Sequence, residues 1–271
     1  MISSLDPAIG YGPVTPATKA LNHTNCQWTY VFRPQMAQAW PADVLMDVFG
    51  TSGMTAYFGM RQCGPIAPGD QVLTAAATGS VGSLAAQLAK IAGARVVGLA
   101  GGEDRCAWAM ETLGLDACVD YRAPDLPARL RRALPSGVDL FSDGVGGALT
   151  RTAVEMMNRG GRLFAYGGSA DFYAREITAP PRGQTMRTMF GVTDEIEALL
   201  KAKDARAEAW IVDAFYHERL EAEDALSELL RSGALKPVNA VFDGFETLPQ
   251  AVVALYAQPH AGKLQVRFAP D

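Results

Sequence analysis

The chain has 271 residues, of which 49% are hydrophobic and 20% charged, and its formal net charge is −5. This composition is typical of a globular protein with one large domain or two smaller ones. The acidic balance, with a pI near 5.3, and the lack of a basic run argue against a nucleic-acid-binding surface.

The start of the chain carries no targeting or membrane signal. The segment MISSLDPAIG has neither a basic region nor an apolar core, so it does not resemble a secretory signal peptide. No uninterrupted apolar run reaches the length of a membrane span. We therefore expect a cytoplasmic protein without a membrane partner.

Cysteines and histidines are too scattered to predict a metal centre. The four cysteines contain no CxxC pair, and the three histidines lie far apart in the sequence. Such spacing favours free thiols in a reducing compartment over a zinc site or a disulfide framework. We expect no metal ligands in this chain.

Residues 1–50 show little periodicity, so we expect loops with short strands there. From residue 71 onward, strands alternate with helices. The pattern predicts strands at 71–75, 95–100, 117–121, 138–142 and 162–166, with helices after the first glycine turn and at 103–113, 126–134 and 149–158. This alternation predicts an α/β fold, a doubly wound parallel (Rossmann) sheet with both faces covered.

The C-terminal third has a different pattern. Residues 193–232 are rich in alanine and glutamate, which predicts helix up to Gly233. Residues 238–243 and 263–268 predict strands, with a helix at about 247–257 between them. These strands would form a small β-structure with the N-terminal segment.

The turn AAATGSVGS (75–83) has almost no large side chains, and it lies between the first strand and its helix. Parallel folds of this kind bind a pyrophosphate at such a turn, on the N–H groups that begin the helix. The candidate residues are Gly79, Ser80, Val81 and Gly82. A tight helix–strand crossing would also need small residues, so packing is the alternative.

The end of the second strand favours NADP over NAD. An NAD enzyme carries an acidic residue there for the ribose, but this chain has Gly101 and Gly102, followed by Arg105. A cation in the first turn of a helix opposes the helix dipole. A 2′-phosphate would account for Arg105, and so would an ion pair with Glu103, Asp104 or a distant carboxylate.

Two more glycine clusters follow the fourth and fifth strands. They contain Gly144, Gly146 and Gly147, and then Gly167 and Gly168. Any one cluster could be a flexible loop or a helix start. Because all three clusters fall at the same edge of the sheet, we expect a cofactor groove there.

Five motifs in this order resemble the zinc-free medium-chain dehydrogenase/reductases, in the branch of the prostaglandin, leukotriene B4 and curcumin-type enone reductases. They are GMTAYFGM (53–60), AAATGSVGS (75–83), VVGLAGGEDRCAW (96–108), VDLFSDGVGG (138–147) and GGRLFAYGG (160–168). The resemblance implies that NADPH delivers hydride to an α,β-unsaturated carbonyl. It also implies a homodimer, because family members often pair through sheet edges.

The resemblance assigns roles to individual residues. It implies that Arg105 and Tyr121 hold the 2′-phosphate, that Thr55 lies near the nicotinamide, and that Gly167 and Gly168 lie beneath it. Three positions depart from the family's pattern, and each change alters a polar contact on the cofactor side. Gly144 replaces an asparagine, His260 replaces the asparagine of an Asn-x-Gly-Lys motif, and Phe172, next to Tyr173, replaces a tyrosine.

Only about 50 residues precede GMTAYFGM, whereas family members begin with a complete GroES-like domain. We therefore expect three parts. Residues 1–50 would be a truncated, mostly β GroES-like remnant, 51–232 the Rossmann NADP-binding domain with a helical extension, and 233–271 the strands that return to the remnant.

The leading hypothesis is a zinc-independent, NADP(H)-dependent reductase acting on a conjugated carbonyl. No side chain is an obvious acid, although Tyr57, Tyr166 and Tyr173 could each serve, and each could equally be a packing residue. A non-redox cyclase or isomerase of a bulky polyketide-like intermediate is the second hypothesis. An NADP-sensing or partner-binding protein without turnover is the third.

Overall fold

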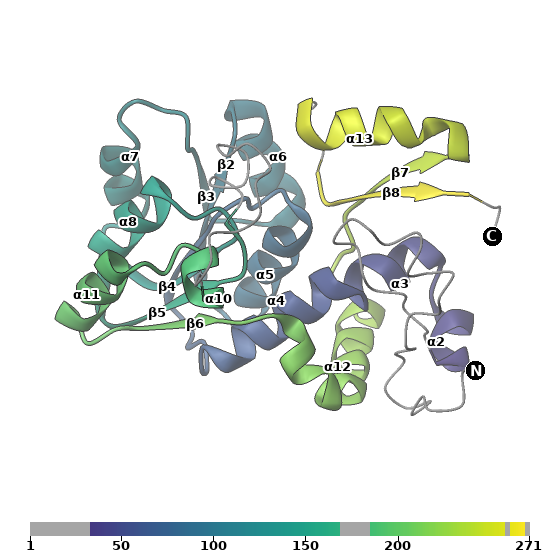
Figure 1. Ribbon diagram of the computed structural model, residues 1–271, viewed down its shortest axis with the longest axis horizontal. Coiled ribbons are helices and arrows are strands. Elements are labelled where there is room, and N and C mark those ends of the chain that lie inside the picture. Colours follow the sequence, from purple (N-terminus) through teal and green to yellow (C-terminus); the bar gives the residue numbers. More distant parts are fainter. Residues whose placement is uncertain (1–32, 169–184, 258–260, 269–271) are drawn as a thin grey trace.

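The computed structural model describes residues 33–168, 185–257 and 261–268. A six-stranded parallel sheet forms one end of the molecule, and a smaller two-stranded sheet lies at the other end (Figure 1). The large sheet contains β1 (Gln71–Thr74), β2 (Arg95–Ala100), β3 (Ala117–Asp120), β4 (Val138–Asp143), β5 (Met157–Ala165) and β6 (Arg206–Ala209). None of the described helices is both long and apolar enough to span a membrane.

Strand order in the large sheet is β3-β2-β1-β4-β5-β6, and every pairing is parallel. The order reverses between β1 and β4, where Val72 lies opposite Leu140. A reversal at this point is the arrangement of dinucleotide-binding sheets, which place ligands beyond the carboxyl ends of the strands. The Rossmann sheet predicted from the sequence is confirmed.

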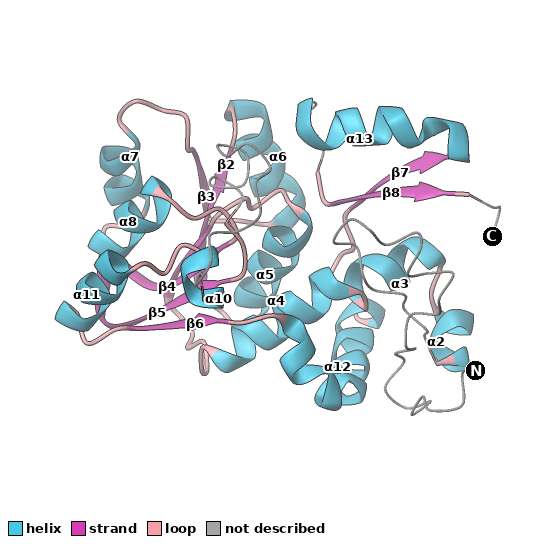
Figure 2. Cartoon of the chain, in the orientation of Figure 1, coloured by secondary structure: helices cyan, strands magenta, loops and turns pink. Residues whose placement is uncertain are grey.

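Helices cover both faces of this sheet (Figure 2). One face packs against α4 (Thr51–Gln62), α5 (Ser80–Ile91) and α6 (Glu103–Leu113), and the other against α7 (Leu126–Ala133), α8 (Ala148–Glu155) and α11 (Asp194–Ala202). Successive strand residues point to opposite faces, so Val72 and Leu140 lie in one core cluster and Leu73 and Phe141 in the other. Two buried faces explain why these strands are apolar throughout.

One strand was missed by the sequence prediction. The segment 193–232, expected to be helical throughout, contains β6 at Arg206–Ala209 between α11 and the 3₁₀ helix η1 (Val212–Glu218). Alanine, arginine and glutamate favour helix locally. Here the free edge of β5 overrides that preference, because each residue of β6 pairs with one of 162–165.

The expectation of short strands in the N-terminal 50 residues is wrong for the part that the structure describes. Residues 34–48 form two short helices, α2 (Pro34–Ala39) and α3 (Ala42–Val48). Val44, Leu45 and Val48 recur at helical spacing and are buried. Each helix has fewer than eight residues, with α2 ending before Trp40 and α3 beginning after Pro41, so neither is long enough to produce a clear periodicity.

The C-terminal strands form as predicted, and they pack on α3. Strands β7 (Asn239–Asp243) and β8 (Lys263–Arg267) pair in parallel, with η2 (Phe245–Thr247) and α13 (Leu248–Ala257) between them. The Gln265 amide donates to the Asp43 carbonyl at 2.9 Å, and the Asn239 amide donates to the Asp43 carboxylate at 3.2 Å. Chain segments from both ends therefore meet, while the boundaries at 50 and 232 remain predictions.

A buried ion pair holds α12 (Arg219–Arg231) to the N-terminal segment. Arg219 Nε donates to Glu223 Oε1 at 2.7 Å, with both side chains at most 2% exposed. Arg33 Nε donates to the second oxygen, Glu223 Oε2, also at 2.7 Å. One carboxylate thus neutralises two guanidinium groups from distant parts of the chain.

We expect Glu223→Ala to lower the free energy of unfolding by about 3–5 kcal/mol, because a buried guanidinium would lose its carboxylate. The control is Asp224→Ala, which removes the neighbouring carboxylate that is 75% exposed and also contacts Arg33. This change should cost about 0–1 kcal/mol. Urea denaturation measures both, and similar small losses for the two variants would contradict the assignment.

Candidate functional site

Most of the predicted cofactor residues lie at one edge of the large sheet, beyond the carboxyl ends of its strands. They form three groups. Gly79, Ser80, Val81 and Gly82 follow β1; Gly101, Arg105 and Tyr121 follow β2 and β3; Gly144, Gly167 and Gly168 follow β4 and β5. Because β1 and β4 are adjacent, the first and third groups flank the point where the strand order reverses.

The turn after β1 ends at Gly79, which caps α5 with extended backbone. Gly79, Ser80 and Val81 are half-buried, so the N–H groups at the start of α5 lie near the surface. Gly82 is different, because a Cβ there would lie 2.2 Å from the Ala76 carbonyl oxygen. The packing explanation therefore applies to Gly82, and the Gly79 N–H is used within the turn, where it donates to the Ala76 carbonyl at 2.8 Å. Ser80 and Val81 remain the candidates for a ligand.

Helix α4 brings two hydroxyl groups to this turn. Ser80 Oγ donates to Ser52 Oγ at 2.5 Å, and Thr55, one turn further along α4, is 8% exposed. The sequence prediction included Thr55 and missed Ser52. A serine at the start of a helix carries no functional signal by itself, so only the packing of α4 on α5 identifies it.

Tyr57, a predicted catalytic residue, lies on another face of α4 and does not join the glycine turn. Its ring packs edge-on against Phe58, and the Arg61 guanidinium lies 5.9 Å from the ring centroid. Burial, followed by the charge of Glu221, raises the pKa of the Tyr57 hydroxyl. These contacts connect Tyr57 to the region of η1 and α12 rather than to the carboxyl edge of the sheet.

Asp120 ties the loops after β2 and β3 to each other. Its Oδ1 accepts from the N–H groups of Gly102 and Arg122, each at 3.0 Å. These two donors hold the pKa of the Asp120 carboxyl below its usual range. Both loops are therefore fixed side by side, which places Gly101 next to Tyr121 and Arg122.

Gly101 has the side chains of Tyr121 and Arg122 directly above it, both 3.1 Å from the position of a Cβ. The Arg122 guanidinium lies 5.6 Å from the centroid of the Tyr121 ring and makes no hydrogen bond to the residues that the structure describes. Arg105, half-buried, lies in the first turn of α6, which follows the same loop. An arginine and a tyrosine thus cover the position where an NAD enzyme carries an acid, and a second arginine follows it in the chain.

Arg122 was missed by the sequence analysis. The sequence indicated Arg122 only through its position directly after Tyr121, a predicted site residue. The sequence offers many arginines in loops, and only the pairing of β2 with β3 brings this one over Gly101.

The loop after β4 is shaped by the fully buried Asp143. Its carboxylate accepts from the N–H groups of Val145 at 2.8 Å and Gly146 at 3.1 Å, and from the Thr150 hydroxyl at 2.5 Å. Burial nevertheless raises the pKa of the Asp143 carboxyl. The hydrogen bonds explain the role of this residue, which is to hold the loop rather than to transfer a proton.

Loops after β4 and β5 touch through their backbones. A Cβ on Gly167 would lie 2.7 Å from the Gly144 carbonyl oxygen, and one on Gly168 would lie 2.4 Å from the Met189 carbonyl oxygen. The Tyr166 ring covers Gly144, where a Cβ would lie 2.5 Å from it. The asparagine expected at residue 144 therefore has no room in this chain, because Tyr166 occupies its space.

Tyr166 is the predicted catalytic tyrosine that lies at this edge. Its hydroxyl is buried without a hydrogen-bond partner among the described residues, and its ring is half-buried. Burial, followed by the charge of Asp143, raises the pKa of this hydroxyl. The geometry gives Tyr166 a packing contact with Gly144 and a buried hydroxyl.

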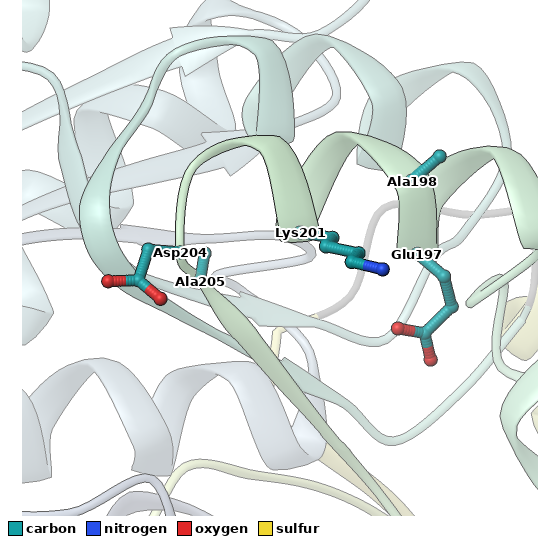
Figure 3. Close-up of a pocket in the computed structure, with 5 residues that line it drawn as sticks. All are labelled: Glu197, Ala198, Lys201, Asp204 and Ala205. Atoms are coloured by element: carbon teal, nitrogen blue, oxygen red, sulfur yellow. The ribbon is translucent and has the colours of Figure 1, made fainter.

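Two further predicted site residues, Tyr173 and His260, lie outside the described residues, as does Phe172. Over the described ranges, no group of three or more histidine, cysteine, aspartate or glutamate side chains could hold a metal ion. A hollow of about 410 Å³ lies beside α11 and the turn that precedes β6, at the opposite, amino end of that strand (Figure 3). Its polar lining is Glu197, Lys201 and Asp204, and it contains none of the predicted site residues.

We expect Gly144→Asn, which restores the family's residue, to lower the free energy of unfolding by about 1–3 kcal/mol through its clash with Tyr166. Tyr166→Ala removes the obstacle, so Gly144→Asn should cost less in that background. The two changes would then couple by roughly 0.5–3 kcal/mol in thermal or urea unfolding. Strictly additive losses would refute the contact.

Comparison with known proteins agrees with this geometry. Residues 80–203 match the family model described as "Zinc-binding dehydrogenase". The NADPH-dependent curcumin reductase of Escherichia coli (strain K12) is 30% identical over 227 residues, which cover 83% of this chain and 63% of the relative. Prostaglandin reductase 1 of Bos taurus is 31% identical over 231 residues, covering 84% and 65%. The chain thus spans slightly less than two thirds of the length of these curated relatives.

A solved structure extends the likeness to three dimensions. CurA of Vibrio vulnificus, crystallised in complex with NADPH, is 30% identical and superposes with a TM-score of 0.73, covering 86% of this chain and 67% of that one. The shared region includes the Rossmann sheet and the glycine turn that begins α5. This chain belongs to the medium-chain dehydrogenase/reductase superfamily, which includes the curcumin and prostaglandin reductases.

Proposed function

We propose that this protein binds NADP(H) and reduces a small conjugated carbonyl compound, such as an enone or quinone. When bound, NADPH supplies a hydride to such a substrate. The N–H groups of Ser80 and Val81 would hold the pyrophosphate at the start of α5. Arg105, Tyr121 and Arg122 would hold the 2′-phosphate.

The observation that carries this proposal is the arrangement of side chains around Gly101, at the end of β2. The side chains of Tyr121 and Arg122 lie over Gly101, each 3.1 Å from the point where a Cβ would be. Residue 101 is a glycine, so no acidic side chain stands there. An acid there would repel a 2′-phosphate, whereas a guanidinium binds it with a charge-assisted hydrogen bond. The residues present therefore fit NADP better than NAD.

The remaining functional details are parts of the same proposal. The names of the relatives favour a reductase: one is a curcumin reductase, one a prostaglandin reductase, and one a putative NADP-dependent oxidoreductase of Bacillus subtilis (strain 168). A cyclase or a non-catalytic sensor finds no support among these names. A cytoplasmic location, a homodimer and a proton-donating role for Tyr173 stay predictions.

We expect Arg122→Ala and Arg105→Ala each to weaken NADPH binding by about 1.5–3 kcal/mol, the size of a hydrogen bond to a charged group. NADH binding should be nearly unchanged, because NADH lacks the 2′-phosphate. Arg159→Ala is the control, since this exposed arginine begins β5 at the opposite edge of the sheet. Fluorescence titration measures all three, and equal losses for both cofactors would refute the proposed site.

We also expect a metal chelator to leave enone-dependent NADPH oxidation unchanged. Catalytic zinc needs about three protein ligands around one point, and the sequence scatters its cysteines and histidines. Assaying the purified protein before and after dialysis against a chelator checks this. Loss of activity that added zinc restores would overturn it.

A further inference from the structure

Two cysteine side chains meet beside the loops that follow β2 and β3. Cys106 lies near the start of α6 and Cys118 lies in β3. Both are free cysteines, and their thiols are hydrogen-bonded to each other. Cys118 pairs with Gly98 of β2, and its Sγ lies 3.3 Å from the point where a Gly98 Cβ would be. The missing side chain at Gly98 thus leaves room for the Cys118 thiol.

This thiol pair is connected directly to both loops of the proposed 2′-phosphate site. Arg105 immediately precedes Cys106, and Asp120 follows Cys118 after one residue. Asp120 accepts from the Gly102 N–H at 3.0 Å, which already joins the loop before α6 to the loop after β3. A covalent bond between the two thiols would therefore act on both loops at once.

Packing is the alternative explanation, because a free cysteine behaves as a small apolar residue. It accounts for a single buried thiol such as Cys63, which is 0% exposed. It does not account for a second thiol in contact with the first, since any small apolar residue would fill that space. Cys106 is 6% exposed and Cys118 is half-buried, so a small reagent can reach the pair from the surface.

We propose that Cys106 and Cys118 form a reversible disulfide by exchange with a low-molecular-weight disulfide such as glutathione disulfide. One cysteine thiolate attacks a sulfur of glutathione disulfide and expels one glutathione thiolate. The second cysteine thiolate then attacks the protein sulfur of this mixed disulfide and expels the other glutathione. The two cysteines lose two electrons and two protons, and glutathione disulfide takes up both to become two glutathione thiols.

The disulfide should weaken the 2′-phosphate site. An S–S bond is shorter than the contact between two hydrogen-bonded thiols, so its formation draws the start of α6 towards β3. The loop at Gly101 has little room to adjust, because the side chains of Tyr121 and Arg122 lie 3.1 Å from the point where a Cβ would be. This consequence for the cofactor rests on the proposed function, whereas formation of the disulfide does not.

Exchange should be slow near neutral pH and faster at higher pH. The thiolate, not the thiol, is the nucleophile. Burial raises the pKa of both thiols, and the negative charge of Asp120 acts in the same direction on each, as does that of Glu103 on Cys106. A higher pH therefore increases the thiolate fraction and the rate of exchange.

The sequence allows a direct test of the disulfide. Trypsin cleaves after Arg105 and Arg122, so one peptide, residues 106–122, contains both cysteines. The protein is incubated with glutathione disulfide at about pH 9, alkylated under denaturing conditions and digested, and the peptides are weighed by mass spectrometry. Peptide 106–122 should accept two labels before treatment and none afterwards, with the loss of two hydrogen atoms. Dithiothreitol should restore both labels, while Cys63, in another peptide, keeps its label throughout.

Fluorescence titration of the oxidised and reduced protein tests the effect on the cofactor. Oxidation should weaken NADPH binding by roughly 5- to 20-fold, part of the loss of a hydrogen bond to a charged group, and should leave NADH binding nearly unchanged. Cys118→Ser should form no disulfide and keep its NADPH affinity after treatment. Cys63→Ser is the matched control and should respond as the wild-type protein does.

Persistent labelling of peptide 106–122, or a mixed disulfide with glutathione that does not resolve, would overturn the disulfide. Formation of the disulfide with unchanged NADPH affinity would overturn its effect on the 2′-phosphate site. A reduced protein that binds no NADPH would overturn the proposed function, and the labelling of peptide 106–122 would still decide whether the disulfide forms.

Discussion

The parallel pairing of β1 with β4 is the constraint on which the rest of the site depends. Strands on either side of this pair follow opposite orders, so their following loops diverge, which is the arrangement of dinucleotide-binding sheets. Parallel pairing also brings every carboxyl end to the same edge. The glycine turn after β1 and the glycine loops after β4 and β5 therefore meet there, although more than 60 residues separate them in the sequence.

The glycines at this edge do not all have the same role. Gly82, Gly167 and Gly168 each lie against a backbone carbonyl that leaves no space for a Cβ, so packing alone accounts for them. Gly101 is different, because the groups above it are the long polar side chains of Tyr121 and Arg122. A glycine-rich motif thus combines packing and binding positions, and only contacts separate the two.

The C-terminal segment links the second sheet to the glycine turn. Gly262 donates to the Thr78 carbonyl in the turn after β1, while Gln265 and Asn239 contact α3. The same short strand thus connects the start of α5 to the N-terminal helices.

Local sequence patterns determined the alternating strands and helices between residues 71 and 166, because apolar periodicity and turn glycines there agree with the final fold. They also determined the glycine turn and Arg105 as candidate residues, whereas Tyr121 was implied by the resemblance to the reductase family. The tertiary structure alone decided β6, since its helix-favouring residues become a strand only against the edge of β5. It alone placed Arg122 over Gly101 and Ser52 beside Ser80, because each gains its neighbours from segments distant in sequence. It also decided that Tyr166 fills the space above Gly144: two residues 22 positions apart become adjacent only when β4 and β5 pair.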